Sequence, residues 1–82
     1  MEARQLLAQG DFAKACPKFE ASHRLDPAIG TLLNLAACEE KMGNMVRACA
    51  HYDEVARLTQ QSGQQERARF ARDKAQSLGC PP

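Results

Sequence analysis

The sequence predicts an all-α fold of about five antiparallel helices, arranged as helix-turn-helix repeats. The 82-residue chain is rich in alanine, leucine and the charged and amide residues that favour helix, and it is poor in the β-branched residues that favour strands. Glycine and proline separate segments whose apolar residues recur at helical spacing. The segment GDFAKAC at 10–16 also recurs 33 positions later as GNMVRAC at 43–49. A period of this length indicates stacked helical units.

We expect the first two helices at about 1–9 and 12–25. Gly10 ends the first helix, because glycine tolerates the left-handed conformation found there. Asp11 stands at the N-cap position of the second helix. Pro17 lies near the start of that helix, where we expect a distorted turn rather than a break, and Pro27 ends it. The inner stripe of this second helix consists of Phe12, Ala15, Cys16, Phe19 and Ser22.

The remaining helices are expected at about 29–42, 45–61 and 64–78. Gly43 ends the third helix, Asn44 caps the fourth, and Ser62-Gly63 separates the fourth from the fifth. Leu32, Leu35, Ala36 and Glu39 mark the third helix by their spacing, and the inner stripe of the fifth helix consists of Ala68, Ala71, Ala75 and Leu78.

Composition argues against several classes of function. The formal net charge of +1 provides no electrostatic footprint for nucleic acid. No apolar run is long enough to span a membrane, and the first ten residues have no signal-peptide core. No catalytic constellation or cofactor-binding motif occurs, so we expect neither enzymatic activity nor a cofactor. The compartment stays open between the cytoplasm and the cell envelope.

The repeated pattern resembles the tetratricopeptide repeat (TPR) family, in a bacterial variant. The resemblance implies a short right-handed α-solenoid over 1–78, with a partial unit at 1–28, a full unit at 29–62, a capping helix at 64–78 and a tail at 79–82. The departures are Glu39, at a tyrosine position of the family pattern, and Ser22 and Val55, at an alanine position of the two units. The matching residues are Ala3, Gly10, Phe12, Ala15, Phe19, Leu25 and Pro27 in the first unit, and Leu32, Leu35, Ala36, Gly43, Ala48 and Tyr52 in the second.

The resemblance implies a non-catalytic protein-interaction or assembly module, whose concave groove holds a peptide or a partner helix. Leu33 and Phe70 are expected to be exposed, either as binding anchors or as a surface that a neighbouring repeat covers. The alternative is an architectural spacer within a larger multidomain bacterial envelope protein, which positions adjacent domains and binds nothing. Carried over by position, the groove residues are Arg4, Leu33, Asn34, Ala37, Glu40, Lys41, Arg69, Phe70 and Asp73.

The four cysteines allow a cross-link. Cys16 and Cys38 are predicted to face each other across the boundary between units, joined either by a disulfide or by a contact between two small side chains. Cys49 repeats the position of Cys16, and we expect no cysteine opposite it on the last helix. A zinc site is disfavoured, because the cysteines and histidines lack paired spacing. Glu39 and Glu40, with Lys41, are expected to belong to a solvated face.

Overall fold

Five α-helices joined by short turns make up the computed structural model, which describes residues 2–81. The helices are α1 (Glu2–Ala8), α2 (Phe12–Leu25), α3 (Ile29–Lys41), α4 (Met45–Gln61) and α5 (Gln65–Ser77), and residues 2–81 contain no strand. The predicted all-α class and the number of helices are confirmed, and the predicted bounds agree to within one residue over the described range. Met1 and Pro82, which belong to the predicted first helix and tail, lie outside the described residues.

The turns between helices lie where the sequence has glycine and N-cap residues. Gly10 and Gly43 both have a φ of +80°, the left-handed conformation that ends a helix at little cost for glycine. The Asn44 side chain caps α4 as expected, accepting a hydrogen bond of 3.5 Å from the Arg47 backbone N–H. The expected Asp11 cap is wrong in detail. Asp11 occupies the N-cap position of α2, but its carboxylate makes no capping bond and lies 3.8 Å from Lys14 Nζ instead.

Pro17 does not interrupt α2. The helix continues from Phe12 to Leu25 with the proline inside it. A proline removes one backbone hydrogen bond, here the one to the Ala13 carbonyl, and near the start of a helix the remaining turns hold the geometry.

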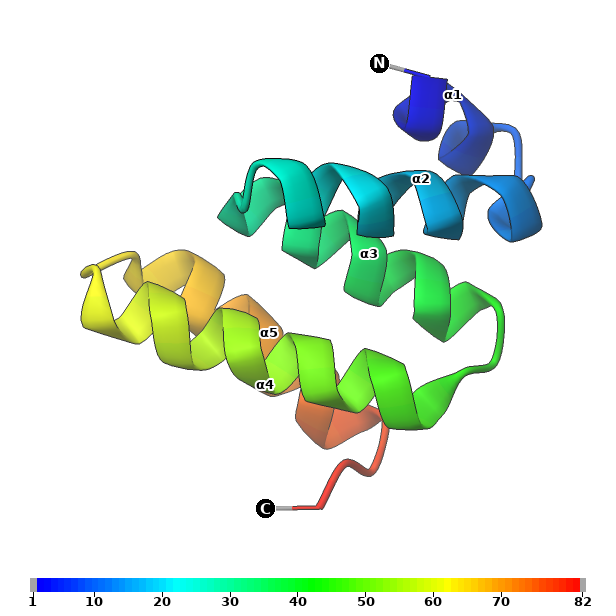
Figure 1. Ribbon diagram of the computed structural model, residues 1–82. Coiled ribbons are helices and arrows are strands. Elements are labelled where there is room, and N and C mark those ends of the chain that lie inside the picture. The colour runs from blue at the N-terminus through cyan, green and yellow to red at the C-terminus, as the bar shows by residue number, and fades with distance from the viewer. Residues whose placement is uncertain (1, 82) are drawn as a thin grey trace.

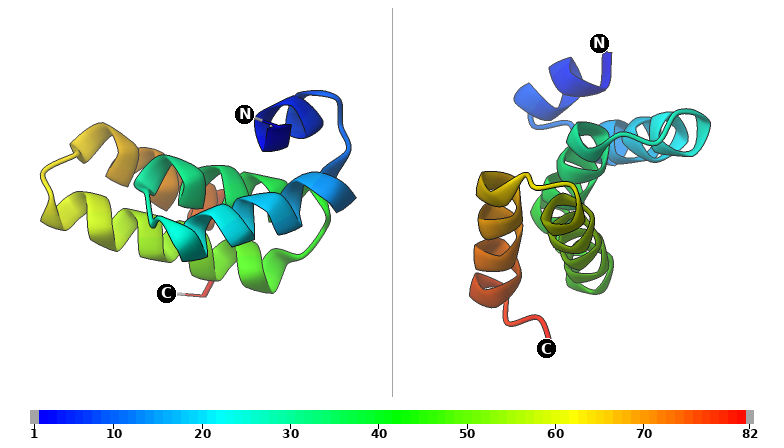
Figure 2. Two further views of the ribbon diagram at one scale, coloured as in Figure 1. Left: turned by 45° about the horizontal axis from the view of Figure 1, so that its top comes forward. Right: turned by 90° about the vertical axis from the view of Figure 1, so that its left-hand side faces the viewer.

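Each helix packs mainly on the helices next to it in sequence. In Figure 1, α2, α3 and α4 lie in order below α1, and the two termini are at opposite ends of the molecule. Figure 2 shows α5 beside α4, with the segment after α5 turning back toward α4. The radius of gyration is 12.0 Å, which is about the value expected for a compact chain of this length.

The core contains the large side chains at matching positions of the two units, with alanines beside them. Phe19 and Tyr52 are fully buried, as are Ala15 and Ala48. Leu32, Leu35 and Ala36 of α3 are buried between them, and α5 contributes only alanines. Leu25, by contrast, is 87% exposed and takes no part in the core. The small side chains let neighbouring helices approach closely, which is how a core with few aromatic residues reaches dense packing.

Candidate interaction surface

The expected groove residues are distributed over three helices. Arg4 is exposed on α1, at the opposite end of the molecule from α5 (Figure 1). The α3 residues are half-buried, except for Lys41, which is exposed, while Arg69, Phe70 and Asp73 of α5 are all exposed. The expectation of an exposed Leu33 is wrong. Its side chain is half-buried and packs against the core, because α3 has neighbouring helices on more than one side.

Glu40 joins α3 to both of the helices that follow it. Its carboxylate accepts a hydrogen bond of 2.9 Å from the Tyr52 hydroxyl of α4, and Lys74 of α5 donates to the same oxygen at 3.3 Å. Burial, together with the hydrogen bond to Glu40 and the negative charge of that carboxylate, raises the pKa of Tyr52 well above its ordinary value. Glu40 is therefore already occupied by internal partners, which corrects its assignment to a solvated face.

The Glu40–Lys74 ion pair brings one edge of α3 next to one edge of α5. The two helices run in the same direction, because one antiparallel helix lies between them (Figure 1). Ala37 and Phe70 each lie about one turn before the paired residues, so they come to the same level along the two helices. Phe70 is 47% exposed there, although its ring is large and apolar. We call this area the α3–α5 strip and define it by Asn34, Ala37, Lys41, Arg69, Phe70 and Asp73.

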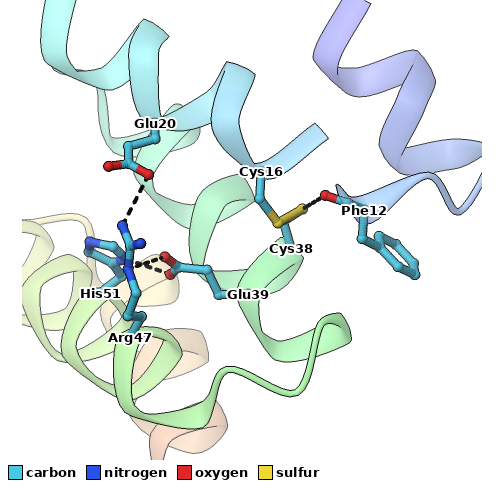
Figure 3. The surroundings of a disulfide bond; sticks show 7 residues. All are labelled: Phe12, Cys16, Glu20, Cys38, Glu39, Arg47 and His51. Carbon is cyan, nitrogen blue, oxygen red and sulfur yellow. Dashed lines mark hydrogen bonds and ion pairs between the residues drawn. A yellow bond between two sulfur atoms is a disulfide. The ribbon is translucent and has the colours of Figure 1, made fainter. Parts of the chain in front are cut away.

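A second polar cluster joins α2, α3 and α4, and the sequence did not reveal it. Glu39 is only 3% exposed, so placing it on a solvated face is wrong. As Figure 3 shows, His51 and Arg47 of α4 both approach its carboxylate, with His51 Nδ1 2.5 Å from Oε1 and Arg47 Nε 3.1 Å from Oε2. The Arg47 contact is an ion pair without hydrogen-bond alignment, because Oε2 has no hydrogen-bond partner among the described residues.

Arg47 extends this cluster to α2. Its Nη2 atom lies 3.1 Å from Glu20 Oε2, so a single guanidinium holds carboxylates from two helices. Arg47 and His51 are four residues apart, so they lie one turn apart on the face of α4 that contacts Glu39. This spacing was the only signal in the sequence that could have indicated the cluster. A buried carboxylate with two cationic or hydrogen-bonding partners fixes how the helices are aligned.

Two disulfides cross-link the chain. Cys16 of α2 is bonded to Cys38 of α3, with their Cα atoms 5.6 Å apart. We expected either a disulfide or a contact between two small side chains for this pair, and the structure contains the disulfide. Cys49 is bonded to Cys80, with their Cα atoms 5.5 Å apart. The expectation that Cys49 has no partner is wrong. Its partner lies not on the last helix but just beyond it, where the chain turns back toward α4 (Figure 2).

The structure also shows whether the described residues include a group that could bind a metal ion or a helix that could span a membrane. Within residues 2–81, no group of three or more histidine, cysteine and carboxylate side chains is placed to hold a metal ion. None of the five helices has both the length and the apolar character needed to cross a bilayer. Comparisons of the chain with protein-family models, curated proteins and solved structures found no match.

Proposed function

We propose that this protein is a TPR-like interaction module and that the α3–α5 strip binds an extended peptide or a helix of another protein. The observation that carries this proposal is the exposed Phe70 ring, held beside α3 by the Glu40–Lys74 pair. An exposed apolar area rimmed by polar side chains is typical of an interaction surface. Aromatic residues are also the side chains that most often dominate binding energy at protein interfaces.

The packing of the helices supports the TPR-like part of the proposal. Four of the residues that carry the resemblance, Ala15, Phe19, Ala48 and Tyr52, are fully buried in matching positions. Consecutive helices pack in antiparallel pairs, which is the arrangement from which such repeats are built. In that arrangement, α3 and α5 are the first helices of successive units, and these line the binding groove of the family.

The composition of the strip indicates the kind of partner. Lys41 and Arg69 are exposed cations, and Asp73 is an exposed anion one turn from Arg69. Phe70 and Ala37 form an apolar centre between these charged residues. A partner segment with one apolar side chain flanked by charges of both signs matches this surface, because a buried apolar centre inside a polar rim is the usual anatomy of an interface.

Selection from a displayed peptide library, with the folded protein as bait, tests the proposal. We expect a binding peptide whose affinity falls at least tenfold in the double variant Phe70→Ser with Lys41→Glu, a loss of about 1.4 kcal/mol or more. The matched control is Val46→Ser, which removes an 84% exposed apolar side chain of α4 outside the strip and should leave affinity unchanged. Circular dichroism checks that all variants remain helical.

Two outcomes contradict the proposal. If the selected peptides bind the double variant as well as the original protein, the strip is not the binding surface. If repeated selections yield no specific peptide, the protein is better explained as an architectural spacer.

A further inference from the structure

The Cys49–Cys80 disulfide differs from the Cys16–Cys38 disulfide in the kind of structure that it joins. Cys16 and Cys38 both lie within helices, whereas Cys80 lies in the short segment that follows α5. Gly79 has a φ of +73°, and the Cys80 backbone N–H donates a hydrogen bond of 2.9 Å to the Ala75 carbonyl. This is the Schellman arrangement that ends a helix. The helix ending therefore holds Cys80 against α5 by a backbone hydrogen bond that does not involve the disulfide.

The two disulfides also differ in access. Cys49 is half-buried and lines an apolar hollow of about 410 Å³, between Met45 and Val46 of α4 and Leu78 and Pro81 after α5. Cys80 is half-buried as well and lines a second hollow, of about 330 Å³, on the side of Arg72 and Gln76. Both cysteines of this bond can thus be approached from an open hollow.

The Cys16–Cys38 bond is more enclosed. Cys38 is fully buried, and its sulfur lies 3.6 Å from the Phe12 backbone carbonyl (Figure 3). Thiol–disulfide exchange requires a thiolate to reach a sulfur atom, and its rate depends on that access. A reagent can approach this bond only at half-buried Cys16 unless the helices separate.

We propose that Cys49–Cys80 is a site of thiol–disulfide exchange in the folded protein, with a dithiol as its reactant. A thiolate of the dithiol attacks one sulfur, forming a mixed disulfide while the bond between Cys49 and Cys80 breaks. The departing cysteine leaves as a thiolate and takes up a proton. The second thiol of the reagent then loses its proton and attacks the reagent's own sulfur in the mixed disulfide, so that the other cysteine leaves as a thiolate and takes up a proton in turn. The protein gains two thiols, and the dithiol is oxidised to a disulfide.

Exchange at this site leaves the helices in place. α5 keeps its packing on α4 through the buried side chains of Ala68, Ala71 and Ala75, which are not part of the covalent link. What is released is the covalent link between α4 and the segment after α5, which lines one side of the 410 Å³ hollow. Because the helix ending holds Cys80 against α5, which itself packs on α4, the reverse reaction restores the same pair. We call the Cys49–Cys80 disulfide the latch, because it is a covalent link that can open and close reversibly between α4 and the segment after α5.

Reduction of the native protein with dithiothreitol tests this assignment. Samples are acid-quenched at intervals, the free thiols are alkylated with iodoacetamide, and the labelled peptides are quantified by mass spectrometry. We expect Cys49 and Cys80 to become labelled at least tenfold faster than Cys16 and Cys38, while the circular dichroism signal persists. Equal rates for the two pairs, or earlier labelling of Cys16 and Cys38, would overturn the proposal.

Paired variants keep the test decisive. The variant Cys16→Ser with Cys38→Ser retains only the proposed latch and should be reduced as fast as the latch of the original protein. The variant Cys49→Ser with Cys80→Ser retains only the enclosed bond and should be reduced at least tenfold more slowly. Comparable rates in the two variants count against the proposal, and if either variant fails to fold, the labelling order in the original protein decides alone.

Discussion

At the scale of single residues, the core depends on side chains that are small where helices meet. Ala15 and Ala48 occupy matching positions of the two units and are completely buried. Phe19 and Tyr52, one turn further along the same helices, fill the space beside them. A methyl group at each alanine position lets two helices approach closely, and a larger group would force them apart.

Replacement of Ala48 by leucine should therefore destabilise the protein by about 1–3 kcal/mol, because the added atoms have no free space to occupy. Ala50→Leu is the matched control. Ala50 is exposed on the same helix, so its replacement should change the free energy of unfolding by less than about 0.5 kcal/mol. Urea unfolding curves provide the measurement. Equal midpoints for Ala48→Leu and the original protein would mean that Ala48 is not at a tight crossing.

Tyr52 makes the stability depend on pH in the alkaline range. The fold raises the pKa of Tyr52 above its ordinary value of 10.0, so the folded protein holds the phenolic proton more tightly than the unfolded chain does. As the pH rises above 10, the unfolded chain releases this proton first, and the free energy of unfolding falls. Tyr52→Phe should remove this part of the decline.

Because Tyr52 is the only tyrosine in the chain, its ionisation can be followed directly by tyrosinate absorbance. We expect the absorbance of the folded protein to rise at a higher pH than that of the protein unfolded in denaturant. Coincident titration curves for the two states would contradict the burial of the Tyr52 hydroxyl against Glu40.

At the scale of helices, the boundaries between neighbours are held by cross-links and polar clusters as well as by apolar packing. The Cys16–Cys38 bond and the Glu20–Arg47–Glu39 cluster both lie where α2 meets the next unit. Glu40 connects α3 to α4 and α5 through Tyr52 and Lys74. These specific contacts fix how the helices slide and rotate against one another, which alanine surfaces alone specify poorly.

Removal of the Cys16–Cys38 disulfide by a double serine substitution should lower the free energy of unfolding by roughly 3 kcal/mol, as expected for the entropy of closing a loop of this length. The two cysteines are 22 positions apart, and those of the second bond are 31 apart, so the expected losses are nearly the same for the two bonds. Thermal unfolding of the two double-serine variants, side by side, measures both losses. A loss near zero for Cys16–Cys38 would mean that the bond adds no constraint beyond the packing.

At the scale of the whole molecule, stability should vary along the stack of helices. α4 lies between α3 and α5, contributes five buried residues and holds one end of the second disulfide. α1 has seven residues, packs mainly on α2 and buries only Ala3. In a linear array of helices, an element with a single neighbour opens most easily.

Amide hydrogen exchange followed by mass spectrometry should therefore show α1 exchanging first and α4 last. Deletion of residues 1–10 should leave the protection of α4 nearly unchanged, because α1 packs mainly on α2. Simultaneous exchange of α1 and α4 would show that the chain unfolds as one cooperative unit, and the order predicted from the stack would then be wrong.

The helices can be predicted from the sequence because the signals that define them are local. The 33-residue recurrence, the helical spacing of apolar residues and the positions of Gly10, Gly43 and Pro27 define five helices. Glycine and proline act on the backbone at their own positions, so their effects can be predicted without knowledge of distant parts of the chain. The facing of Cys16 and Cys38 could be expected from the same periodicity, because both lie on regular helices.

Which polar groups are buried and which cysteine meets Cys49 depend on how the helices pack, and could not be predicted from the sequence. Glu39 is charged and was assigned to solvent, but Arg47 and His51, which lie one helix later, compensate its burial. Leu33 was expected to be exposed and packs on the core, and Cys49 was expected to lack the partner that it has in Cys80. Cys80 follows the last helix, where no periodicity predicts direction, and only the path of the chain after Gly79 brings it to α4. Such contacts depend on how whole helices are placed in space, and the pattern within one segment does not contain that information.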